Sequence, residues 1–116
     1  MDALSRLQTW YAAQCDGNWE HQEGIRIETL DNPGWRVTIN LTGTALEGRP
    51  FTEVAVGVGA DAHPASPRWM HCWSEDGLWQ AATDERQLAH VLELFLDWAG
   101  VSAATGAILS GGAEGS

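Results

Sequence analysis

Apolar and polar residues alternate along the middle of the chain, and this alternation predicts β-strands. The clearest case is residues 35–41, where Trp35, Val37, Ile39 and Leu41 are separated by polar side chains. A period of two residues is typical of a strand with one buried face. The same reasoning predicts four other strands, at residues 24–30, 51–58, 69–75 and 78–82.

Turn-forming residues separate these strands. Residues 31–34, Asp-Asn-Pro-Gly, join the first two strands, and Gly34 is expected to take the positive φ of a type II turn after Pro33. Asp76-Gly77 is typical of a two-residue hairpin turn. Residues 59–68 contain two prolines and no periodicity, so we expect a surface loop there.

Two stretches have the period of amphipathic helices. The first helix is predicted over residues 2–14, and Gly17 is expected to end it. Its buried stripe is predicted to consist of Leu4, Leu7, Tyr11 and Gln14, with Trp10 beside it. Arg6 lies outside this stripe. The second helix is expected to begin with Asp84 as N-cap, paired with Gln87 in a capping box, and to end at Gly100. Its apolar stripe is Leu88, Val91, Leu92, Phe95 and Ala99.

These elements predict an α+β fold in a single two-layer domain. An antiparallel β-meander of about five strands carries the N-terminal and the C-terminal helix on one face. We expect the domain to span residues 1–100 and the Gly- and Ala-rich residues 101–116 to form a flexible tail. The other face of the sheet is then free, and it would show Arg26, Glu28, Arg36, Thr38, Asn40, Glu53 and an aromatic residue of the fourth strand.

The charge of the chain restricts its partners. Sixteen acidic residues oppose six basic ones, which gives a net charge of −10. This balance argues against nucleic acid and against anionic membranes as partners, and favours either plain solubility or capture of a basic protein. The sequence has no signal-peptide pattern and no membrane-spanning stretch, and its two cysteines do not form a disulfide framework. We therefore expect a cytoplasmic protein with free thiols. The oligomeric state is left open.

One short region invites a chemical interpretation. Cys15, Glu20 and His21 could form a small metal- or ligand-binding site or an enzyme centre, but they lack metal-ligand spacing and a third orienting residue. A carboxylate–histidine pair that fixes the loop is the structural alternative. We therefore expect no catalytic residue, no metal and no cofactor. The seven tryptophans are expected to be mainly core, although tryptophan is also favoured at protein-binding hot spots.

The same region carries a family resemblance. A run of residues resembles the signature of the immunity protein 53 family: Trp10, Cys15, Asp16, Trp19, Glu20, His21, Asp31, Asn32, Pro33, Gly34 and Trp35. Further matches follow at Trp69, Cys72, Leu88, Leu92, Phe95 and Trp98. The resemblance implies a small cytoplasmic protein, encoded beside a toxin of a bacterial polymorphic toxin system, which binds and neutralises that toxin without a cofactor.

Two hypotheses about the residues follow. The run from Trp10 to Trp35 is expected to be mainly structural, holding the end of the first helix to the hairpin. The toxin, for which a basic nuclease domain is our working hypothesis, would then contact the free sheet face and the loop at residues 59–68. The residues expected to bind it are Glu28, Arg36, Asn40, Glu53, Asp61, Trp69, Trp73 and Glu75.

Overall fold

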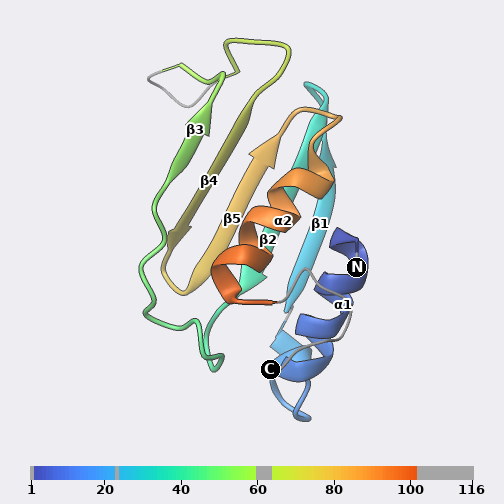
Figure 1. The fold of residues 1–116 in the computed structure, drawn as a ribbon, viewed down its shortest axis with the longest axis vertical. Coiled ribbons are helices and arrows are strands. Elements are labelled where there is room, and N and C mark those ends of the chain that lie inside the picture. The colour runs from blue at the N-terminus through green and yellow to red at the C-terminus, as the bar shows by residue number, and fades with distance from the viewer. Residues whose placement is uncertain (1, 23, 60–63, 102–116) are drawn as a thin grey trace.

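The computed structural model describes residues 2–22, 24–59 and 64–101, which form one five-stranded antiparallel sheet with two α-helices and a short 3₁₀ helix (Figure 1). The helices are α1 (Ala3–Gln14), η1 (Trp19–Gln22) and α2 (Leu88–Ala99). The strands are β1 (Ile25–Leu30), β2 (Gly34–Asn40), β3 (Val54–Val56), β4 (Met70–Glu75) and β5 (Leu78–Thr83). The predicted α+β class and the five antiparallel strands are confirmed.

The strand order differs from that of a simple meander. It is β1-β2-β5-β4-β3, so β5 lies beside β2 and β3 lies at the far edge. Val37 and Ile39 of β2 face Ala81 and Trp79 of β5, so the two strands with the most deeply buried inner rows meet at the centre of the sheet. The short β3, whose Val56 is 55% exposed, occupies an edge.

Both helices pack on the same face of the sheet, as predicted (Figure 1). Trp10 of α1 meets Phe95 of α2 edge to face, with 5.0 Å between ring centroids. Phe95 in turn contacts Trp79 of β5 at 5.1 Å. These rings join both helices to the sheet in one hydrophobic core, and aromatic pairs of this geometry stabilise such cores beyond their buried area.

The buried side of α1 was predicted correctly at Leu7 and Trp10 and wrongly at Leu4, Arg6 and Tyr11. Leu4 and Tyr11 are 60% and 39% exposed, and the residues that face the core are Ala3, Arg6, Leu7 and Trp10. Arg6 is buried because its guanidinium reaches the other helix. Its Nη2 donates to Asp97 Oδ1 at 2.8 Å and to the carbonyl oxygen of Val101 at 2.6 Å. A charged residue thus joins α1 to the C-terminal end of α2.

One predicted helix cap and one predicted helix start also need correction. Helix α1 ends at Gln14, the last residue predicted, but its C-cap is Cys15 and not Gly17, whose positive φ belongs to the following loop. Helix α2 begins at Leu88, and Asp84 is not its N-cap. Gly100 does end α2, as predicted, and it has the left-handed conformation.

The two glycine turns have different physical causes. Asp76 and Gly77 both have positive φ, 52° and 76°, which is the backbone of a type I′ hairpin turn and confirms the predicted two-residue connection. Gly34 does not have the positive φ that was predicted. Glycine is needed there because a Cβ would lie 2.2 Å from the carbonyl oxygen of Thr83 on β5.

The remaining predictions of element boundaries agree with the structure only in part. The strand expected at residues 51–58 is shortened to Val54–Val56, and Val58 forms an isolated bridge with Pro64. Of the predicted tail, Val101 is half-buried against the core and its N–H donates to Leu96. The rest of that tail, and Asp61 in the predicted loop, lie outside the described residues.

Candidate functional site

The segment after α1 is held by two carboxylates that accept hydrogen bonds from the backbone. Glu20 accepts from the N–H groups of Asp16 and Gly17, at 3.0 and 2.8 Å. Asp16 accepts from the N–H groups of Asn18 and Trp19, both at 3.0 Å, and these bonds lower the pKa of its carboxyl. Both oxygens of Glu20 are therefore engaged by backbone donors, so Glu20 fixes this loop through the backbone.

Trp19 connects this segment to the sheet. Its ring is buried, lies 5.7 Å from Trp10, and donates from Nε1 to the carbonyl oxygen of Asn40 at 3.1 Å. Gly24 passes against the ring so closely that a Cβ there would lie 2.5 Å from it. Trp19 thus holds η1 against the C-terminal end of β2.

The second half of the signature lies at the opposite end of β2. Residues 31–33 form the exposed turn between β1 and β2, and Trp35 donates from Nε1 to the carbonyl oxygen of Glu85 at 3.1 Å. The structure therefore divides the predicted motif into two parts. One part joins the end of α1 to the sheet, and the other joins β2 to the connection that precedes α2.

The alternative site around Cys15 has none of the expected geometry. Cys15 is exposed and its Sγ lies 3.3 Å from the carbonyl oxygen of Tyr11. Within residues 2–22, 24–59 and 64–101, no group of three or more His, Cys, Asp or Glu side chains is placed to hold a metal ion. Cys72 is buried in the core, and burial raises the pKa of its thiol to about 12.

The side of the sheet opposite the helices carries polar and aromatic side chains. We call it the helix-free face. Cross-strand pairs such as Glu28 with Arg36 and Trp73 with Gln80 fix which side chains share it. Its main residues are Arg26, Glu28, Arg36, Thr38, Asn40, His71, Trp73, Glu75, Leu78 and Gln80.

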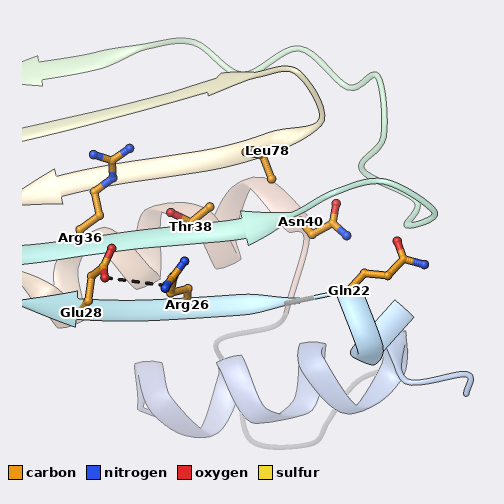
Figure 2. A pocket seen from close by; sticks show the side chains of 7 residues that line it. All are labelled: Gln22, Arg26, Glu28, Arg36, Thr38, Asn40 and Leu78. Atoms are coloured by element: carbon orange, nitrogen blue, oxygen red, sulfur yellow. Dashed lines mark ion pairs between the residues drawn. The ribbon is translucent and has the colours of Figure 1, made fainter. Parts of the chain in front are cut away.

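A groove of about 580 Å³ lies on this face (Figure 2). Its lining consists of Gln22, Arg26, Glu28, Arg36, Thr38, Asn40 and Leu78. Figure 2 shows Arg36 and Glu28 at one end of the groove, Arg26 and Thr38 in its middle, and Asn40 and Gln22 at the other end. Arg26 and Glu28, two residues apart on β1, form an ion pair of 3.8 Å. One end is thus rich in charge and the other in amides.

A row of contacts crosses the face beside the groove. Arg36 donates to Gln80 Oε1, and its guanidinium carbon lies 5.6 Å from the centre of the Trp73 ring. Trp73 stacks on His71 with 4.5 Å between centroids. Carboxylates engage both rings, since Glu53 bonds His71 Nε2 and Glu75 accepts from Trp73 Nε1 at 2.7 Å. These side chains are therefore held in place in the free protein.

A family model described as Immunity protein 53 matches residues 4–100. The chain belongs to the immunity protein 53 family. Neither the curated proteins nor the solved structures contain a match to it. No helix in the part of the chain that the structure describes has the length and apolar character needed to cross a bilayer.

This immunity protein gathers most of its predicted contact residues on the helix-free face. Glu28, Arg36 and Asn40 line the groove, and Trp73 and Glu75 project from β4 on the same face. Glu53 approaches that face through its bond to His71. Among the predicted contact residues that the structure describes, Trp69 is the exception, because it is only 6% exposed and its backbone N–H is bonded to Asp84.

Four residues on or beside this face were named neither among the predicted free-face residues nor among the predicted contact residues: Gln22, His71, Leu78 and Gln80. The alternation in β4 already places His71 beside Trp73, so that residue could have been found from the sequence. Gln80 and Leu78 become visible only when β5 is known to pair with β2. Gln22 comes from η1, a segment predicted as irregular loop.

Proposed function

We propose that this immunity protein binds and neutralises a cognate toxin of a bacterial polymorphic toxin system, in the cytoplasm of the producing cell, through its helix-free face. The observation that supports this surface most strongly is its composition. Trp73, His71 and Arg36 lie in one contacting row on a side of the sheet that neither helix covers. Tryptophan and arginine are the residue types most enriched among binding hot spots.

The structural role of the signature supports the same assignment by a separate route. Asp16, Glu20 and Trp19 use their polar atoms to bond the backbone of the chain itself. Side chains engaged in this way hold the segment between α1 and β1 in place, so their first role is to maintain the fold. The toxin contacts therefore belong to a different surface, and the helix-free face provides one.

The charge of the chain bears on the class of toxin. A net charge of −10 attracts a basic protein over distances up to about 8–10 Å at moderate salt. We infer a basic toxin domain, with a nuclease as the favoured type, because an enzyme that acts on nucleic acid carries clustered cations around its substrate groove. Inhibition would occur by binding that blocks the toxin, with no reaction of the immunity protein's own.

Co-expression in a bacterial host tests the proposal. The wild-type chain should protect the host from the toxin encoded by the neighbouring gene, and should form a stable complex with a catalytically inactive toxin variant. Trp73→Ala should weaken the complex about 10-fold or more, because it removes a large ring at the contact surface. The toxin would otherwise pack against that ring.

A matched control is available on the other layer. Leu4 on α1 is 60% exposed, so Leu4→Ala also removes an exposed apolar side chain, but one on the helix side of the molecule. Leu4→Ala should protect as well as wild type. Failure of the wild-type protein to bind the toxin even at low salt would contradict the proposed function.

A further inference from the structure

The groove on the helix-free face differs in charge from the molecule as a whole. Two of the six arginines of the chain, Arg26 and Arg36, line it together with one carboxylate, Glu28. The other lining residues, Gln22, Thr38, Asn40 and Leu78, are neutral. A chain of net charge −10 thus contains a groove lined by two positive side chains and one negative one.

Arg36 is held in position without a carboxylate partner among the described residues. Its guanidinium contacts the neutral amide of Gln80 and the ring of Trp73, and within that part of the chain it forms no ion pair. Figure 2 shows its side chain extending from β2 toward β5, at the charged end of the groove. A guanidinium fixed in this way has lost part of its rotamer freedom before any partner arrives, which lowers the entropic cost of binding.

The chemistry that matches this arrangement is a carboxylate. Guanidinium groups bind carboxylates through two parallel N–H···O bonds, a geometry that adds specificity as well as energy. A cationic side chain is a poorer occupant, because it would approach both Arg26 and Arg36 and gain only Glu28, which already pairs with Arg26. The amides of Gln22 and Asn40 at the other end can bond the backbone of a protein segment.

We propose that the groove binds an aspartate or glutamate side chain of the toxin, with Arg36 as its anchor. This inference rests on the proposed function and specifies the contact made at that surface. It is compatible with a basic toxin, because net charge governs long-range attraction whereas a single opposed pair fixes the register of the docked surfaces. An acidic residue exposed among the cations of the toxin would meet Arg36 in the groove.

Calorimetric titration of the immunity protein with the catalytically inactive toxin tests this contact. Arg36→Gln should weaken binding about 10- to 100-fold, because it leaves the toxin carboxylate without its partner in the interface. Arg86→Gln is the matched control. It makes the same change in net charge, but Arg86 is exposed in the connection before α2 and does not line the groove. That variant should bind within about 2-fold of wild type.

A third variant shows whether the toxin side chain in the groove is negatively or positively charged. Glu28→Gln should tighten binding if a carboxylate enters the groove, because it removes a like charge from the lining, and should weaken binding if a cation enters. Arg36→Lys keeps the charge but loses the two-pronged geometry, so it should retain part of the affinity. It also serves as the substitution to use if Arg36→Gln lowers the melting temperature of the free protein.

The outcomes separate this inference from the proposed function. Tight wild-type binding with equal dissociation constants for Arg36→Gln and Arg86→Gln would overturn the carboxylate contact and leave the function standing. Loss of binding in Glu28→Gln with Arg36→Gln unaffected would show a cationic occupant and also overturn it. Absence of wild-type binding would overturn both.

Discussion

Asp84 shows how much one buried carboxylate can organise. Its oxygens accept hydrogen bonds from the backbone N–H groups of Trp69 and Arg86, both at 2.9 Å, and from Gln87 Nε2 at 2.7 Å. Its own N–H donates to the carbonyl oxygen of Trp69. Asp84 thus joins the start of β4 to the connection between β5 and α2. The residue type and spacing of an N-cap are present in the sequence, and Arg86 and Gln87 are local donors, but the third donor, the N–H of Trp69, comes from the segment just before β4.

Asp84 also predicts a pH dependence of stability. Burial alone would raise the pKa of its carboxyl, but the hydrogen bonds from Arg86, Trp69 and Gln87 and the nearby charge of Arg68 outweigh burial and hold the pKa below its ordinary value of 3.8. A carboxyl with a lowered pKa in the folded state stabilises the fold above pH 3.8, and this contribution is lost as the pH falls through the lowered value.

The measurement is urea unfolding of wild type and Asp84→Asn across pH. The variant should be less stable by roughly 1–3 kcal/mol at neutral pH, because the amide presents a donor where the carboxylate accepted. The difference between the two proteins should shrink below pH 3.8 as the wild-type carboxyl is protonated. A difference that stays constant down to about pH 2 would contradict this role for Asp84.

At the scale of elements, the sequence predicts best what local pattern decides. The period of two in residues 35–41 predicted correctly which side chains of β2 face the core. The dipeptide Asp76-Gly77 was enough to predict the hairpin turn between β4 and β5. Pairing between distant segments was not predictable, because an apolar inner row can pair with any other strand that has one. The choice of β5 as the neighbour of β2 depends on the whole sheet. The burial of Arg6 was not predictable from local pattern either, because its hydrogen-bond partners lie 91 and 95 residues away in the chain.

The contact between β2 and β5 gives a prediction at this scale. Gly34→Ala places a Cβ 2.2 Å from the backbone oxygen of Thr83, a clash that no side-chain movement can relieve. The start of β2 must then move away from β5, and we expect a loss of roughly 2–3 kcal/mol in the free energy of unfolding. Chemical denaturation measures this loss.

Gly43→Ala provides the comparison. Gly43 has a φ of +82° and a Cβ added there would meet no atom within 4 Å, so this variant bears only the cost of the left-handed backbone, about 1 kcal/mol. Gly34→Ala should therefore be clearly the less stable of the two. Equal stability would mean that close packing of β2 on β5 does not require glycine.

In the whole molecule, one layer provides the hydrophobic core and the other side of the sheet provides the accessible polar and aromatic surface. The helices and the inner face of the sheet bury the core rings Trp10, Trp79 and Phe95, which stabilise the fold. The helix-free face keeps Arg36, Trp73 and their neighbours accessible on a rigid antiparallel support (Figure 1). Its polar and aromatic character was predictable from the alternation in the strands. The groove was not, because it also needs Gln22 from η1 and Leu78 from β5.

The most direct test of the central claim, that the toxin binds the helix-free face, uses the indole N–H signals of the seven tryptophans in a nitrogen-15 NMR spectrum. The Trp73 indole N–H lies on that face and is bonded to the side chain of Glu75, whereas those of Trp35 and Trp98 are bonded to the carbonyl oxygens of Glu85 and Pro50. On addition of the inactive toxin, the Trp73 signal, assigned with Trp73→Phe, should shift or broaden most while the Trp98 signal keeps its position. A complex in which the signal of Trp98 on α2 changes and that of Trp73 does not would contradict the account.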